Sequence, residues 1–143
     1  MHKTFKKALA VLLAVFMVAG FVPFVDLELP TASADTWGGG SSSNGLTPGG
    51  SNSYYINNAN GFEYFAQTVR NGTDYSGKTV YLTTDINMNN RAFSGIGVGD
   101  KFFRGTFDGQ NHTISNLKIN ISDDRVGLFR NTENATIRKL KVS

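Results

Sequence analysis

Short alternations of apolar and polar residues, separated by polar corners, dominate the second half of the chain. In the stretch 102–119, two apolar pieces flank the polar corner 108–111. A similar stretch, 127–142, follows it, and Gly105 and Gly127 are 22 positions apart. Repetition at such a period is typical of proteins built from stacked repeats.

A weaker version of the pattern occupies residues 79–88, so the sequence predicts about three turns of one coil. Such short strands cannot bury their apolar sides as single hairpins. Stacked turns can, because equivalent strands pair in parallel and their inward residues form continuous columns. The repeat predicts three columns, which join Phe107 to Phe129, Ile114 to Ile137 and Leu117 to Leu140.

One helix is predicted ahead of the strands, over residues 61–70, with Asn60 as its N-cap. Clustered aromatic rings can stack on sugars, but the helical spacing of these apolar residues favours burial against a sheet. A stripe in this place is suited to cover the open end of a stack. The stripe consists of Phe62, Phe65, Ala66 and Val69.

The first 34 residues have the pattern of a signal peptide. Basic residues in 2–7 precede the apolar run 8–25, and small residues at 32–34 form a cleavage site. An uncleaved membrane anchor is the alternative. We assign 1–34 as a signal peptide and Asp35 as the first residue of the mature chain, which we expect to be secreted or displayed at the cell surface.

Residues 35–53 are rich in glycine, serine and asparagine, and we predict a flexible linker there. The ordered domain is predicted to span 54–143. Its alternating pattern is still running at Ser143, so we expect this domain to be the N-terminal part of a longer solenoid. The remaining coils of that longer chain are then expected partners.

Composition narrows the classes of function. The chain has 143 residues, no cysteine and a net charge of +3. Without cysteine, neither a disulfide framework nor a thiolate metal site can form. The positive charge is small and scattered, which argues against nucleic acid as a partner. Contact with a membrane is expected only through the signal peptide during export.

Residues 103–117 resemble the GLUG-type repeats of bacterial surface proteins; they read Phe-Arg-Gly-Thr-Phe-Asp-Gly-Gln-Asn-His-Thr-Ile-Ser-Asn-Leu. Residues 127–129 and 135–140 resemble the later part of such a repeat. The resemblance implies an all-β fold, a right-handed parallel β-helix of about three coils with a short N-terminal capping helix. Such segments resemble parts of adhesins, immunoglobulin A1 proteases and polysaccharide-degrading enzymes, so the activity stays open.

Polar residues in the corners are the candidates for chemistry. His112 could act as a base or a metal ligand, but signal cleavage leaves no second histidine to complete a site. Asp108 could pair with Asp85 or Asp124 as the acid–base couple of a glycanase. The alternative is structural, because Asp-Gly favours a turn and a lone histidine can hydrogen-bond the adjacent turn.

Two further groups of charged residues have candidate roles. Asp123 and Asp124, with Asp100, could bind Ca²⁺, but no calcium-loop motif is present. A basic strip on the outer face could bind an acidic polysaccharide or could simply be solvated. This strip consists of Lys118, Arg138, Lys139 and Lys141. We therefore assign no catalytic, cofactor-binding or metal-binding residue and no cofactor.

The preferred hypothesis is a non-catalytic extracellular module with a structural or adhesive role, for which extracellular glycans are the candidate ligands. The alternative is the N-terminal part of a secreted polysaccharide-degrading enzyme or surface protease, with catalytic residues beyond residue 143. The first is preferred because the architectural signals come without an assembled catalytic group.

Overall fold

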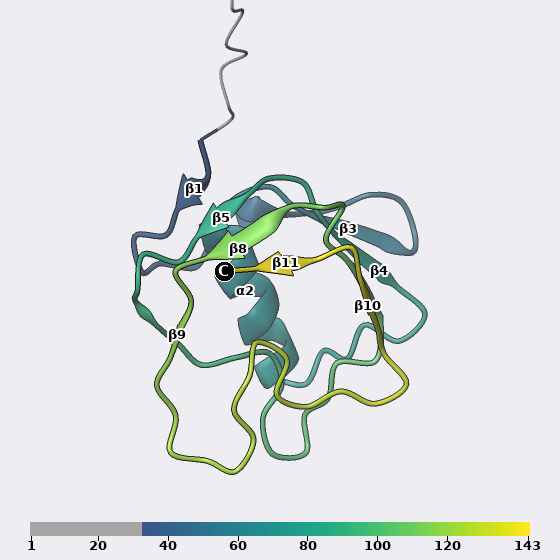
Figure 1. Cartoon of the computed structure of the whole chain (residues 1–143). Helices are drawn as coiled ribbons and strands as arrows, with labels where there is room; N and C mark the ends of the chain where they lie inside the picture. Colours follow the sequence, from purple (N-terminus) through teal and green to yellow (C-terminus); the bar gives the residue numbers. More distant parts are fainter. Residues whose placement is uncertain (1–32) are drawn as a thin grey trace, which may run out of the picture. The chain divides into compact units, whose positions relative to one another are not determined.

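The computed structural model describes residues 33–143, which belong to one compact unit. Within this range lie one α-helix, one 3-10 helix and eleven short strands (Figure 1). The predicted signal peptide lies outside the described residues, except for its last two positions. No helix in the described range is both long enough and apolar enough to cross a membrane.

The strands form three sheets, in the orders β10-β7-β4-β3-β2, β1-β5-β8-β11 and β6-β9. Before the helix the elements are β1 (Asp35–Thr36), the 3-10 helix η1 (Ser43–Gly45), β2 (Leu46–Pro48) and β3 (Ser53–Ile56). The helix is α2 (Ala59–Arg70). After it come β4 (Thr79–Leu82), β5 (Ile86–Asn87), β6 (Ala92–Phe93), β7 (Thr106–Asp108), β8 (Thr113–Ser115), β9 (Lys118–Ile119), β10 (Thr136–Arg138) and β11 (Lys141–Val142).

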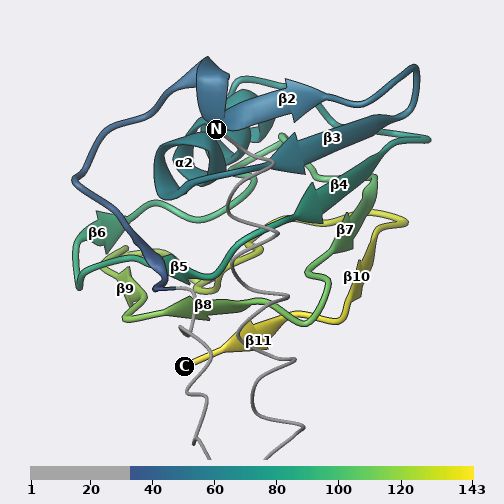
Figure 2. The same ribbon diagram turned by 90° about the horizontal axis from the view of Figure 1, so that it is seen from above.

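Three segments of the chain pair with one another in parallel. The first strand segment (79–93) pairs with the second (106–119), and the second pairs with the third (136–142). Strand β2 differs, because it runs antiparallel to β3. Figure 2 shows the five-stranded sheet from β2 to β10, with β5, β8 and β11 as a second row of strands.

The predicted right-handed parallel β-helix is wrong. The described residues form separate sheets of short strands with mixed parallel and antiparallel pairing, and one helix packs among them. The prediction depended on a repeat of 22 residues, and this is not the spacing at which the strands pair. Ile114 lies opposite Val142, for example, 28 positions later in the chain.

The pairing register accordingly differs from the predicted columns. The residue opposite Phe107 is Ile137, not Phe129. Phe129 instead forms a bridge with Ile96, and the backbone N–H of Arg130 donates to the Ile96 carbonyl at 2.8 Å. The beginning of the stretch 127–142 therefore pairs with the loop before β7, and only its end pairs with β7 and β8.

The side chains that the alternation predicts to face inward are the buried ones, even though the predicted register between strands is wrong. Phe107 and Ile114 are fully buried, whereas Lys118 is exposed. Alternation determines which side chains point inward, because successive residues of a strand face opposite sides. The register between distant strands depends in addition on the length and path of the loops that join them.

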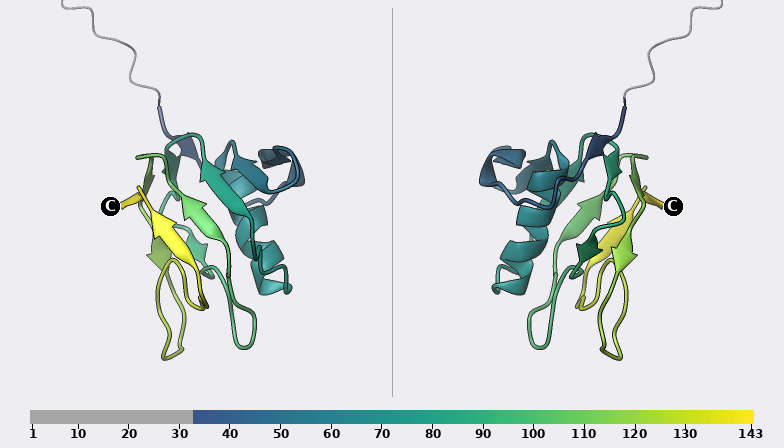
Figure 3. Two further views of the ribbon diagram at one scale, coloured as in Figure 1. Left: turned by 90° about the vertical axis from the view of Figure 1, so that its right-hand side faces the viewer. Right: turned by 90° about the vertical axis from the view of Figure 1, so that its left-hand side faces the viewer.

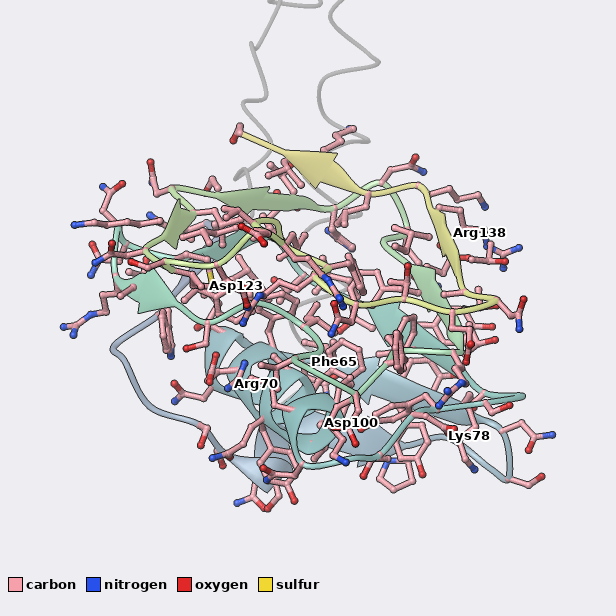
Figure 4. The ribbon with its side chains drawn as sticks, turned by 90° about the horizontal axis from the view of Figure 1, so that it is seen from below. Phe65, Arg70, Lys78, Asp100, Asp123 and Arg138 are labelled. Atoms are coloured by element: carbon pink, nitrogen blue, oxygen red, sulfur yellow. The ribbon has the colours of Figure 1, made fainter. Side chains whose placement is uncertain are left out.

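A single cluster of buried side chains fills the space between the sheets and the helix. Its centre is Phe65, which Figure 4 labels. The Phe65 ring lies 5.1–5.7 Å from the rings of Tyr75, Phe103 and Phe107. Fully burying each such side chain stabilises the fold by about 1.5–3 kcal/mol. The largest fully buried side chains include Phe62, Phe65, Phe93, Phe103, Phe107, Ile56, Leu82, Ile86, Met88, Ile96 and Ile114.

The helix predicted over residues 61–70 is present as α2, but it begins earlier. Its N-cap is Asn58 instead of Asn60, and the Asn58 side chain accepts a hydrogen bond from Gly61 N at 2.8 Å. All four residues of the predicted apolar stripe are buried. Burial excludes a sugar-stacking role for Phe62 and Phe65. At the C-terminal end, Arg70 donates to Gly95 O at 2.7 Å and pairs with Glu63.

Residues 35–53, predicted as a flexible linker, instead contribute β1, η1 and β2 to the folded unit. Trp37 is only 5% exposed and packs edge-on against Phe93. Its indole N–H donates to Gly40 O at 2.6 Å, and Asp35 accepts a hydrogen bond from the helix residue Ala59. The segment therefore belongs to the folded unit despite its glycine-rich composition, because Trp37 and Leu46 are buried and β1 and β2 pair with other strands.

Candidate functional site

The outer face of the five-stranded sheet carries two rows of polar and aromatic side chains. Successive side chains of a strand point to opposite faces. The inward positions of β4 and β7 hold the buried Val80 and Phe107, so the residues on either side of them point outward. Because the strands pair in register, these outward residues align across the sheet.

The first row crosses all five strands and the second crosses four of them. Neighbouring strands are about 4.8 Å apart, so the first row is roughly 19 Å long. It consists of Thr47, Tyr55, Tyr81, Asp108 and Arg138. The second row offers only hydroxyl groups and consists of Ser53, Thr79, Thr106 and Thr136.

Tyr55 and Tyr81 form a stacked pair in the middle of this outer face. Their ring centroids are 5.3 Å apart and the planes differ by 18°. Gly49 lies directly against the Tyr55 ring, where a Cβ atom would collide with it. Both tyrosines are half-buried, so part of the stacked pair remains exposed. The pair therefore provides an aromatic surface on this face.

Asp108 and Arg138 form the end of the first row. Arg138 Nε donates to Asp108 Oδ2 at 2.9 Å, and Gln110 N donates to Asp108 Oδ1 at 3.0 Å. The Asp108 side chain is 5% exposed and that of Arg138 is 52% exposed. Burial alone would raise the pKa of Asp108, but the Gln110 hydrogen bond and the Arg138 guanidinium outweigh burial and lower it. Figure 4 shows Arg138 projecting outward from β10.

The turn between β7 and β8 approaches the third strand segment very closely. A Cβ atom on Gly109 would lie 2.6 Å from the carbonyl oxygen of Lys139, so this position requires glycine. The backbone N–H of Asn111 donates to the same carbonyl at 2.8 Å, and Asn111 has a φ of 67°. The conspicuous polar corner thus serves to hold two strand segments together.

Asp85 and His112 form a separate pair at the corner where β4 leads to β5. His112 Nδ1 lies 3.0 Å from Asp85 Oδ1, which also accepts a hydrogen bond from Thr113 N at 2.9 Å. The Thr113 hydrogen bond, and next the His112 contact, lower the pKa of Asp85. Asp85 and Asp108, considered as an acid–base couple, therefore each have a lowered pKa and accept a hydrogen bond from a backbone N–H.

The acidic residues considered for Ca²⁺ do not come together. Asp123 pairs with Arg130, and Asp100 pairs with Lys101 at 3.0 Å. Asp124 is exposed in the loop after β9. Across residues 33–143, no group of three potential ligands is placed to hold a metal ion.

The basic strip is only partly assembled. Arg138, Lys139 and Lys141 follow one another around the corner between β10 and β11 and are all exposed. Lys118 lies on β9, in the two-stranded sheet, and does not belong to this corner. We call Arg138, Lys139 and Lys141 the basic corner.

The two tyrosines of the outer face were not among the candidate residues that the sequence suggested. Tyr81 stands between Val80 and Leu82, and period-two alternation already places its side chain opposite to those two buried residues. Tyr55 has the same relation to Ile56. The alternation in each strand indicates that its tyrosine points outward. That the two rings stack on one another follows only from the pairing of β3 with β4.

Comparison of the chain with protein-family models, with curated proteins and with solved structures finds no match. The resemblance to GLUG-type repeats accordingly depends on the sequence motifs alone.

Proposed function

We propose that this protein is an exported, non-catalytic module that binds acidic polysaccharides through the outer face of its five-stranded sheet. The observation that carries this proposal is the alignment of Tyr55, Tyr81 and Arg138 in one row beside a row of hydroxyl groups. Side chains on paired strands are held in a fixed order before the ligand arrives, which limits the entropy lost on binding.

The groups on this face match the chemistry of a carboxylated sugar chain. Hydroxyl groups both donate and accept hydrogen bonds, as sugar hydroxyls do. Arginine binds carboxylates through two parallel hydrogen bonds. Tyrosine provides a large amphipathic surface with few rotatable bonds. The basic corner adds a local excess of positive charge next to the rows.

The non-catalytic part of the proposal is supported by the partners of the acidic residues. Asp108 is held by Gln110 and Arg138, and Asp85 by Thr113 and His112. A general acid of a glycosidase needs a raised pKa, whereas both of these pKa values are lowered. The pattern of residues 1–34 and the GLUG-type motif support export to the cell surface or the medium.

The test compares two polysaccharide probes with the same backbone. Polygalacturonate carries carboxylates, and its methyl ester lacks the negative charge. We expect the full chain to bind polygalacturonate more tightly than the ester in affinity electrophoresis. Arg138→Gln should weaken binding to polygalacturonate about tenfold, the effect of losing one hydrogen bond to a charged group.

Lys118→Gln is the matched control, because it removes the same charge from an exposed position outside the outer face. Thr106→Val removes one hydroxyl of the second row and should weaken binding by a smaller factor. Thermal unfolding of each variant separates lost binding from lost folding. Equal losses for Arg138→Gln and Lys118→Gln, or no binding by the wild type, would overturn the proposal.

A further inference from the structure

The predicted cleavage site adjoins the folded unit without a spacer. The sequence pattern places the cut between Ala34 and Asp35. Strand β1 begins at Asp35, and Figure 3 shows this dark blue start of the described chain running directly into the folded unit. The residue that cleavage would make the first of the mature chain is therefore already part of a sheet.

The backbone on the C-terminal side of this bond is held by β5. Asp35 N donates to the Asp85 carbonyl at 2.9 Å, and Trp37 N donates to the Asn87 carbonyl at 2.8 Å. Alternate residues of a parallel strand bond to the same neighbour, so these two hydrogen bonds attach both ends of β1. The nitrogen of the bond to be cut is thus the first donor of this ladder.

Two side chains fix the same short segment to the helix and to the core. The Asp35 carboxylate accepts a hydrogen bond at 2.6 Å from Ala59 N, at the beginning of α2. A carboxylate in this place satisfies a free N–H and faces the positive end of the helix dipole. Trp37 is buried, and its ring packs edge-on against that of Phe93. Residues 35–37 are therefore held through both backbone and side chains.

A peptidase needs this segment to be released from the sheet. In hydrolysis, water adds to the Ala34 carbonyl carbon, the bond to Asp35 N breaks, and this nitrogen takes up a proton as it leaves. The side chains of Asp35 and Thr36 are exposed, but proteolysis of a folded chain depends on local opening of its backbone. The leaving nitrogen stays bonded to the Asp85 carbonyl until β1 separates from β5.

We propose that cleavage after Ala34 has to precede the docking of β1, and that a chain which folds uncut keeps residues 1–34. This inference rests on the export that we propose above. Folding and the membrane-bound signal peptidase then compete for residues 35–37, so the cleaved signal peptide and the uncleaved anchor are two outcomes of one competition. The ammonium group that cleavage creates at Asp35 retains a donor for the Asp85 carbonyl, since an ammonium carries three N–H donors.

The experiment follows cleavage of the full chain by purified signal peptidase in detergent micelles, with mass spectrometry of the products. The comparison is Phe65→Asp, which places a charge in the centre of the core and so prevents folding without altering the cleavage site. We expect this variant to be cut before Asp35 at least about tenfold faster than the folded wild type, because the cleavage rate follows the population of the open form.

Two core variants form a matched pair. Phe93→Ala removes the ring that packs against Trp37. Phe107→Ala removes another buried ring, which contacts Phe65 and Phe129 instead, at a comparable cost to global stability. Phe93→Ala should speed cleavage several-fold more than Phe107→Ala. Amide exchange at Trp37 N reports the opening of β1, and the cleavage rate should rise in proportion to it.

Two kinds of failure are distinguishable. Cleavage of the folded wild type as fast as Phe65→Asp, equal acceleration by the two core variants, or a product that begins at another residue than Asp35 would overturn this inference alone. If Phe65→Asp also stays uncut, residues 1–34 do not act as a signal peptide, which would overturn this inference together with the export in the proposed function.

Discussion

Phe107 shows what a single core residue contributes. Its ring is fully buried and lies 5.7 Å from the Phe65 ring and 5.3 Å from the Phe129 ring. Phe107→Ala should lower the free energy of unfolding by about 3–5 kcal/mol, because it removes a large side chain and leaves a cavity. Lys118→Ala should have little effect, since Lys118 is exposed. Urea unfolding measures the stability of both variants. Equal midpoints would contradict the assignment of Phe107 to the inner face and Lys118 to the outer surface.

Asp108 links stability to pH at the scale of a single residue. Its pKa is lowered in the folded state, so its contribution to stability is complete above the pKa of the unfolded chain. That contribution is lost as the pH falls below about 4 and passes through the lower folded pKa. Asp85 acts in the same direction. We therefore expect the urea midpoint to fall as the pH drops below about 4, the ordinary pKa of aspartate.

Asp108→Asn tests this origin of the pH dependence. The amide oxygen can still accept from Gln110 N, but the charge opposite Arg138 is gone. The variant should be less stable than the wild type at pH 6, a value well above the aspartate range, and the difference should shrink in acid. Asp124→Asn, at an exposed loop position, is the control. A constant difference at every pH would show that Asp108 does not act through its charge.

The helix α2 allows the same kind of test at the scale of an element. Asn58 caps its N-terminus through the hydrogen bond to Gly61 N. Asn58→Ala should lower the free energy of unfolding by about 1 kcal/mol, the usual effect of losing an N-cap side chain. Asn60→Ala, two residues later and exposed, is the matched control and should have a smaller effect. A larger loss for Asn60→Ala in urea unfolding would place the cap where the sequence alone suggested.

Elements that depend on local spacing could be predicted, whereas those that depend on distant pairing could not. The stripe of Phe62 and Phe65 identifies the helix, because i, i+3 spacing is a local property. The register of Phe107 against Ile137 could not be predicted, since it depends on the path of the intervening loop. The row on the outer face could not be predicted for the same reason. Tyr55, Tyr81 and Arg138 come into one row only through the pairing register of distant strands.

At the scale of the whole described unit, the N-terminal segment is attached through the buried side chains of Trp37 and Leu46 and through the pairing of β1 with β5 and of β2 with β3. Composition predicts a flexible linker there, because a run of glycine and serine offers little surface to bury. Two side chains change this outcome. The Trp37 indole is almost fully buried, contacts Phe93, and lies between β1 and η1 in the chain, and Leu46 of β2 is buried as well. Average composition cannot reveal such anchors, because only two residues provide them.

Trp37→Ala should therefore loosen the start of this segment. We expect a loss of about 3–5 kcal/mol, as for other buried large side chains, and faster amide exchange in residues 35–48 than in β7 and β8. Because the chain has one tryptophan, the wild-type emission reports this contact directly. It should be blue-shifted and resist quenching by iodide. Ser41→Ala, a change at the segment's surface, should leave exchange unchanged; an emission maximum like that of free tryptophan would show that the segment is detached.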